Sequence, residues 1–175
     1  MAGESEGSPA PRVVLVGPPG AGKTAVGRVL AERWHVPLCD TDAAVVASAG
    51  KPIADIFVDE GEATFRALER DAVAVALNRC DGVVSLGGGA VMAAETRQAL
   101  QGHRVAFLDV GLAAASSRVG LGSARPLLLG NVRGQLKALL DARRPYYLQV
   151  AEFAVLTDTL VVEEVADEVE RLLDE

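Results

Sequence analysis

The stretch GPPGAGKT, residues 17–24, most constrains what this chain can fold into. It matches the whole phosphate-loop pattern, and it lies between a short β-branched run, residues 13–16, and a helical apolar pattern from Ala25 to Leu30. Its glycines let the backbone turn so that N–H groups face one concave surface, and the start of the next helix adds the positive end of its dipole. We therefore predict a strand, a phosphate-binding loop and a helix in succession.

Lys23 and Thr24 carry the chemistry expected of this loop. The Lys23 ammonium can reach the β- and γ-phosphates of a nucleotide as a point charge, and the Thr24 hydroxyl can coordinate Mg²⁺. The loop alone is compatible with a GTPase, an ATPase, a motor or a small-molecule kinase. The 175 residues fit one domain, and no apolar strand ends in an aspartate like an ordinary Walker B element. The small kinases of metabolites and nucleotides remain as candidates. Asp40 is a better candidate than Asp109 for the metal ligand.

Composition and charge exclude several classes of partner. Half of the residues are hydrophobic and 23% are charged, which is typical of a compact globular protein. The formal net charge of −7 argues against broad binding to nucleic acid, and an aromatic content of 4% is too low for base-stacking platforms. No apolar run approaches the length that spans a bilayer, and the opening MAGESEGSPA leads into no signal-peptide pattern. We expect a cytoplasmic protein without nucleic-acid or membrane partners.

The two cysteines, Cys39 and Cys80, show no pattern that assigns them a chemical role. They have neither metal-ligand spacing nor a disulfide framework around them, which suits a reducing compartment. Free cysteines behave as small hydrophobic residues and are often buried. We therefore predict that both are buried free thiols.

Hydrophobic periodicity divides the chain into alternating strands and helices. Residues 1–11 are small and polar and predict a disordered, mobile leader, so a single domain is expected from residue 12 to 175. Asp59 and Glu62 are spaced like a pair that caps the helix after them. About five strands alternating with helices predict a parallel sheet covered on both faces. Strands are expected at residues 13–16, 36–39, 83–86, 104–110 and 153–156, and later helices at residues 43–49, 61–79, 93–101, from about 131, and 162–173.

Two further segments have the composition of ligand-binding loops. Residues 118–130 hold three glycines, a proline and two arginines without clear periodicity, and we expect a mobile lid over about residues 111–130. Gly87, Gly88 and Gly89 follow the predicted strand of residues 83–86. Three glycines at a strand end suit close approach of the backbone to a ligand.

The sequence Asp40-Thr41-Asp42 stands at the carboxyl end of the second predicted strand, where ligands of open parallel sheets gather. Two carboxylates two residues apart point roughly the same way in an extended segment. One can hold Mg²⁺ through water while the other accepts a proton from a substrate hydroxyl. In the alternative interpretation, Asp40 or Thr41 only caps the next helix. Capping and catalysis are compatible.

Taken together, these motifs resemble those of the shikimate kinases, in the nucleoside-monophosphate-kinase-like group of phosphate-loop proteins. The resemblance covers about residues 12–158 and implies a P-loop kinase fold with a lid. In that fold, three α/β/α layers surround a five-stranded parallel sheet of order 2-3-1-4-5. Besides the phosphate loop, the matching pieces are DTD at 40–42, IADIF at 53–57, GEATFRALE at 61–69, SLGGGA at 85–90, RPLL at 125–128 and ARRPYY at 142–147.

The resemblance implies transfer of the γ-phosphoryl group of MgATP to the 3-hydroxyl of shikimate, in the pathway to chorismate and the aromatic amino acids. Asp42 then acts on the substrate hydroxyls, together with Lys23 and with Arg125 in a lid that closes over the γ-phosphate. Arg66 and Arg143 match the arginines that bind the substrate carboxylate. The other contacts implied are with shikimate through Gly88 and Gly89, with the nucleotide through Gly20, Ala21, Gly22, Lys23, Thr24, Ala25, Arg118 and Arg125, and with Mg²⁺ through Thr24 and Asp40.

Other functions stay open at this point. The chain is also compatible with a gluconate or nucleotide kinase of the same fold, or with a nucleotide-binding module that has lost turnover. The paired carboxylates and Arg125 argue against a pure binder, which needs no base beside the γ-phosphate. One departure from the family concerns the adenine side, where many relatives have Asn or Arg with Pro and this chain has Leu160 after Asp158-Thr159. We expect a monomer.

Overall fold

A parallel sheet of five strands forms the middle layer of the protein. The structure, a computed structural model, describes residues 8–119 and 131–175. The strand order is β2-β3-β1-β4-β5, and every neighbouring pair is parallel. The predicted fold class and the strand order implied by the resemblance are both confirmed. The strands are β1 (Val13–Val16), β2 (Leu38–Asp40), β3 (Val83–Ser85), β4 (Val105–Asp109) and β5 (Phe153–Leu156).

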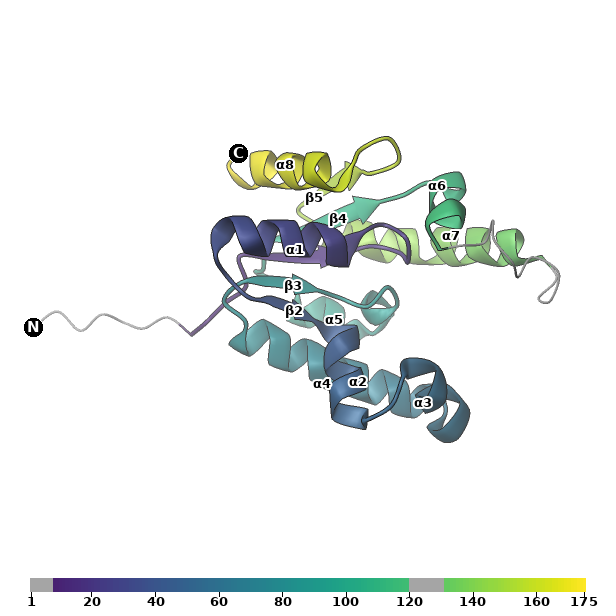
Figure 1. The fold of residues 1–175 in the computed structure, drawn as a ribbon. Helices are drawn as coiled ribbons and strands as arrows, with labels where there is room; N and C mark the ends of the chain where they lie inside the picture. Colours follow the sequence, from purple (N-terminus) through teal and green to yellow (C-terminus); the bar gives the residue numbers. More distant parts are fainter. Residues whose placement is uncertain (1–7, 120–130) are drawn as a thin grey trace, which may run out of the picture.

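Helices cover both faces of this sheet (Figure 1). They are α1 (Lys23–Trp34), α2 (Thr41–Ala49), α3 (Ile53–Glu60), α4 (Glu62–Arg79), α5 (Ala94–Ala99), α6 (Leu112–Arg118), α7 (Val132–Val150) and α8 (Val162–Leu173), with a 3-10 turn, η1, at Ala90–Met92. None of the helices in the described ranges is long and apolar enough to cross a membrane.

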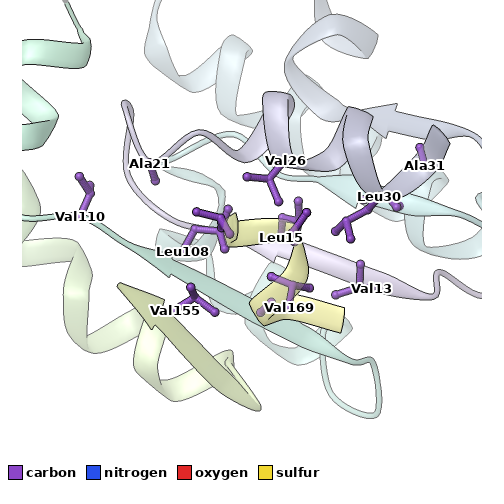
Figure 2. Close-up of a cluster of buried hydrophobic side chains, with 14 of the residues drawn as sticks. Val13, Leu15, Ala21, Val26, Leu30, Ala31, Leu108, Val110, Val155 and Val169 are labelled. Carbon is purple, nitrogen blue, oxygen red and sulfur yellow. The ribbon is translucent and has the colours of Figure 1, made fainter. Parts of the chain in front are cut away.

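The central strand β1 is apolar throughout because it packs against a helical layer on each side. Val13 and Leu15 belong to a cluster with side chains of α1 and α8 (Figure 2). Val14 and Val16, which alternate with them, belong to a second cluster with side chains of α4 and α7. All four are at most 1% exposed. The strand that enters the phosphate loop is therefore held rigidly from both faces.

Helices α2 and α3 and the start of α4 form a projection beyond the sheet (Figure 1). We call residues 41–79 the α2–α4 lobe. The lobe has a small core of its own, formed by Val45, Ile56 and Phe65, which is separate from the two clusters on the sheet. The chain enters the lobe from β2, at one edge of the sheet, and leaves it toward β3.

The predicted cap of the long helix is wrong. Asp59 lies inside α3, where its carboxylate accepts a hydrogen bond of 3.2 Å from Lys51. Helix α3 ends at Gly61, whose φ of +86° interrupts the helical path, and α4 starts at the next residue. No side chain of the described residues caps α4. The helix predicted over residues 61–79 is present as α4, but the residue expected to cap it belongs to α3, a helix that was not predicted.

The prediction of two free thiols is also wrong, because Cys39 and Cys80 form a disulfide. Cys39 lies in β2, and Cys80 follows the last residue of α4. Since α4 returns the chain to β3, the strand that pairs with β2, its end comes beside Cys39, and the two Cα atoms are 6.5 Å apart. This distance suits a disulfide. A separation of 41 residues hides the proximity in the sequence.

The expected leader and lid are described only in part. Residues 1–7 of the leader lie outside the described residues, as do residues 120–130 of the lid, which include Arg125. The described part of the lid contains the short helix α6, which the sequence did not predict, and Arg118 is its last residue.

Candidate active site

The phosphate loop follows β1 directly and closes around its own lysine. Gly20 and Gly22 have φ angles of +82° and +89°, which favour glycine, and Gly22 is the residue before α1. The Lys23 ammonium donates hydrogen bonds to the carbonyl oxygens of Gly17, at 2.7 Å, and Pro18, at 3.0 Å. The loop thus has the strand, turn and helix that a phosphate site requires.

Lys23 lies in a crowded electrostatic environment. Burial lowers the pKa of its ammonium to about 8, while the carboxylates of Asp42 and Asp40 oppose this change and the guanidinium of Arg143 adds to it. Burial of a cation is costly unless opposite charge lies close to it. An anion bound in the loop would therefore favour the charged form of Lys23.

Asp40 fits both roles considered for it. One of its oxygens, Oδ1, accepts a hydrogen bond of 3.1 Å from the backbone N–H of Ala43 and caps α2. The other, Oδ2, accepts a hydrogen bond of 2.8 Å from the hydroxyl of Thr24. The carboxylate and the hydroxyl form a pair of hard oxygen donors next to the phosphate loop.

This donor pair suits Mg²⁺. Magnesium usually keeps several waters and takes one or two protein oxygens together with substrate phosphates. Residues 8–119 and 131–175 contain no group of three or more His, Cys, Asp or Glu residues that could hold a metal. Asp109, the weaker candidate, is already paired with the guanidinium of Arg144 at 2.5 Å.

Gly87 joins the carboxyl ends of β2 and β3. Its backbone N–H donates a hydrogen bond of 3.0 Å to the hydroxyl of the buried Thr41. A methyl group on Gly87 would lie 2.5 Å from Oδ1 of Asp42, a distance that real side chains do not tolerate. The glycine therefore leaves the space that the Asp42 carboxylate occupies.

Two arginines approach the next two glycines. A methyl group on Gly89 would lie 2.6 Å from Nη1 of Arg66, and one on Gly88 would lie 3.4 Å from Nη1 of Arg143. On Gly88 it would also lie 3.0 Å from Cδ of Pro19 in the phosphate loop. The glycine segment, residues 87–89, is thus the place where the phosphate loop, the α2–α4 lobe and α7 meet.

Burial raises the pKa of the Asp42 carboxyl, and the charge of Asp40 raises it further. Lys23 and Arg66 act in the opposite direction. A carboxylate that binds a proton more readily than in water is suited to accept one from a hydroxyl. The site therefore combines a base with two guanidinium groups.

Glu69 is a site residue that the sequence analysis missed. Its side chain is buried, and its carboxylate accepts a hydrogen bond of 2.8 Å from Nη1 of Arg66. Burial raises the pKa of Glu69, and Arg66 opposes the change. The spacing of three residues on one helix was the available signal, because such residues share a face. Glu69 holds the guanidinium that lies against Gly89.

Tyr147 is the second residue that the sequence analysis did not assign to the site. Its ring is buried and stacks on Phe107, with 5.0 Å between the ring centroids. Its hydroxyl donates a hydrogen bond of 2.5 Å to the carbonyl oxygen of Gly88. Burial raises the pKa of Tyr147 to about 12, so the hydroxyl keeps its proton and remains a donor. Tyr147 thus connects α7 to the glycine segment.

Arg118 reaches the phosphate loop from its other side. Its guanidinium donates to the carbonyl oxygen of Gly20 at 3.2 Å, and to the hydroxyl and carbonyl oxygens of Thr157 at 2.8 and 2.7 Å. The next residue, Asp158, accepts a hydrogen bond of 2.8 Å from the backbone of Gly111. Thr157 therefore holds Arg118 beside the phosphate loop.

The structure brings most of the sequence-predicted residues to the carboxyl ends of β1, β2 and β3. Ala21 and Ala25 belong to the loop and to the first turn of α1. Arg125 lies outside the described residues. The residues gathered around the loop and the glycine segment are Gly20, Gly22, Lys23, Thr24, Asp40, Asp42, Arg66, Gly88, Gly89 and Arg143.

Comparison with known proteins identifies the family. The family model described as shikimate kinase matches residues 19–174. The chain belongs to the shikimate kinase family. A shikimate kinase from Salinispora arenicola is 59% identical over 94% of this chain and 98% of its own length. One from Thermobifida fusca is 56% identical over 90% of this chain and 91% of its own.

Solved structures of the shikimate kinase family agree with this fold. The shikimate kinase from Acinetobacter baumannii, solved in complex with shikimate, has a TM-score of 0.85 and 34% identity over 92% of this chain and 91% of its own. The shikimate kinase from Aquifex aeolicus has a TM-score of 0.81 and 29% identity over 93% of this chain and 95% of its own.

The hydrogen bond from Tyr147 to Gly88 predicts a stability change. Tyr147→Phe keeps the ring but leaves the Gly88 carbonyl without this donor, so the free energy of unfolding should fall by about 1–2 kcal/mol. Urea unfolding measures it. The matched control is Tyr146→Phe, because the Tyr146 ring lies under the Arg97 guanidinium and is retained. Equal stability of both variants would contradict the role given to Tyr147.

Proposed function

We propose that this chain transfers the γ-phosphoryl group of ATP to the 3-hydroxyl of shikimate, in the pathway to chorismate and the aromatic amino acids. One observation carries the proposal. Methyl groups on Gly87, Gly88 and Gly89 would lie 2.5, 3.4 and 2.6 Å from Asp42, Arg143 and Arg66, and the one on Gly88 would also lie 3.0 Å from Pro19 of the phosphate loop. A base, two guanidinium groups and a phosphate site are therefore close together. Family membership supports ATP as the phosphoryl donor.

On the nucleotide side, the loop from Gly20 to Ala25 would surround the phosphates with backbone N–H groups. Lys23, which bonds to its own loop in the structure, would turn its ammonium to the β- and γ-phosphates. Thr24 and Asp40 would hold Mg²⁺, which neutralises charge on the phosphate oxygens when it is bound. Arg118 would lie near the nucleotide, because it contacts Gly20.

On the acceptor side, Arg66 and Arg143 would bind the carboxylate of shikimate. A guanidinium group can donate two parallel hydrogen bonds to a carboxylate, which fixes the orientation of the ring. Glu69 keeps Arg66 in place. The backbone of Gly88 and Gly89 would lie against the ring, and Asp42 would orient the 3-hydroxyl and accept its proton.

Three further parts of the proposal rest on the sequence and the family. Arg125 is proposed as a catalytic residue on the RPLL match alone, and residues 12–175 are proposed to form one domain with a lid. We also propose a cytoplasmic monomer. Size-exclusion chromatography with light scattering measures the oligomeric state.

The direct test of the function is a coupled assay for ADP with shikimate, gluconate and AMP offered separately. Of the three acceptors, only shikimate should support turnover, because its carboxylate and 3-hydroxyl suit the arginine pair and Asp42. Turnover with gluconate or AMP but not with shikimate would contradict the proposed substrate. ATP hydrolysis independent of every acceptor would contradict a kinase.

We predict that Asp42→Asn lowers kcat by about two to four orders of magnitude, the usual range for a positioned general base. The amide keeps the size but loses the proton acceptor. In the wild type, kcat/KM should fall as the pH is lowered and Asp42 is protonated. This fall should occur at a pH above about 3.9, the ordinary pKa of Asp, because the pKa of Asp42 is raised. A kcat within a factor of about three of the wild type would remove Asp42 from the mechanism.

We predict that Arg66→Lys and Arg143→Lys each lower kcat/KM for shikimate about ten- to hundredfold, although the charge is kept. The expected cost is about 1.5–3 kcal/mol for a lost charged hydrogen bond. The KM for ATP should change far less. The control substrate is a shikimate analogue with a neutral amide, which the wild type should use poorly. Equal use of amide and acid would contradict the assignment of both arginines.

We predict that ATP binding depends on the protonation of Lys23. With a pKa of about 8 in the free protein, the ammonium loses its charge as the pH rises through 8, and the phosphates bind the charged form. The Kd for ATP should therefore be constant below this pH and rise above it, by up to about tenfold per pH unit. Calorimetry in buffers of different ionisation enthalpy should show proton uptake on binding. Lys23→Arg should abolish the uptake, and a pH-independent Kd in the wild type would contradict the prediction.

A further inference from the structure

The disulfide encloses the segment that carries the acceptor side of the site. Cys39 and Cys80 stand at the two ends of a stretch that contains Asp40 and the whole α2–α4 lobe. Asp42, Arg66 and Glu69 all lie between the two cysteines. The bond therefore closes a ring around the residues on which acceptor binding would depend.

The α2–α4 lobe is held to the rest of the protein where the chain enters and leaves it, and by Val73, Ala76 and Leu77 of α4, which pack in the second cluster on the sheet. Its core of Val45, Ile56 and Phe65 is separate from the two clusters on the sheet. The entry strand β2 has three residues and stands at the edge of the sheet, where β3 alone pairs with it. Units with a small core of their own open locally at a lower free energy than the whole protein. A bond between entry and exit opposes this opening.

The two cysteines differ in their access to solvent. Both line a cavity of about 730 Å³ between α1, α2 and α4, but Cys80 is 3% exposed, whereas Cys39 is partly exposed. The charged residues on this cavity are Arg28, Asp40, Asp71 and Arg79, whose formal charges cancel. Since Cys39 is the more exposed of the two and the charges on the cavity balance, we expect a small reagent of either charge to react with Cys39 first.

We propose that Cys39 and Cys80 are a reversible redox site that takes low-molecular-weight thiols and disulfides, and that their disulfide clamps the α2–α4 lobe. Disulfides in the cytoplasm, the location proposed above, are usually transient or redox-sensing, because thiols there are kept reduced. This proposal concerns the stability of the lobe, so it holds whichever acceptor the site binds.

Oxidation proceeds by two exchanges. The Cys39 thiolate attacks one sulfur of a small disulfide, forms a mixed disulfide and releases one thiolate. The Cys80 thiolate then attacks the Cys39 sulfur, forms the bond seen in the structure and releases the second thiolate. Two protein thiols are oxidised, one small disulfide is reduced to two thiols, and a thiol reagent in excess reverses both steps.

Hydrogen exchange of the full chain, followed by mass spectrometry, tests the clamp. After treatment with oxidised glutathione the intact mass should show the loss of two hydrogen atoms, and dithiothreitol should restore them. Peptides from residues 41–79 should then exchange roughly tenfold faster or more in the reduced protein, while peptides from residues 132–173 remain unchanged. The melting temperature should fall on reduction by roughly 8–15 °C.

Two variants and one labelling experiment complete the test. In Cys39→Ser and in Cys80→Ser, hydrogen exchange of residues 41–79 should be equally fast after oxidised glutathione and after dithiothreitol, because neither variant can form the disulfide. In the reduced wild type, iodoacetamide should label Cys39 before Cys80. Two free thiols after oxidised glutathione, a mixed disulfide that does not resolve, or equal exchange of residues 41–79 in both forms would overturn the proposal. The wild-type comparison decides the question even if a variant fails to fold.

Discussion

The candidate site depends on the missing side chains of residues 87–89. Methyl groups on Gly87 and Gly89 would lie 2.5 Å from Asp42 and 2.6 Å from Arg66, so these two glycines leave the space that both side chains occupy. A methyl group on Gly88 would crowd Pro19 of the phosphate loop at 3.0 Å. The parallel pairing of β3 with both β1 and β2 places this segment between the phosphate loop and Asp40. Hydrogen bonds from Gly87 to Thr41 and from Tyr147 to Gly88 hold it in position.

Charge balance in this space follows from the same arrangement. Burial raises the pKa values of Asp42 and Glu69 and lowers that of Lys23, so each ionised form needs a partner. Lys23 has Asp42 and Asp40 near it, and Arg66 has Glu69. An incoming phosphate or carboxylate adds negative charge where cations are crowded, which favours binding of anionic ligands over water.

Local sequence signals predicted the parts of the structure that local interactions determine. The β-branched run before GPPGAGKT became β1, and residues 153–156 and 162–173 became β5 and α8 with the predicted bounds. Contacts between distant residues left no such signal. The partnership of Cys39 with Cys80 and that of Tyr147 with Gly88 arise from the return of α4 and α7 to the sheet. Helix α3 was not predicted, because its eight residues are too few to show a clear helical periodicity.

The most direct test of the account is the kinetics of Gly89→Ala. Gly89 has a φ of −96°, which alanine can adopt, so the substitution adds little but a methyl group 2.6 Å from Nη1 of Arg66. If the space at residues 87–89 positions the acceptor, the KM for shikimate should rise about tenfold or more, while the KM for ATP and the melting temperature change little. An unchanged KM for shikimate in a folded variant would contradict the claim that this segment organises the site.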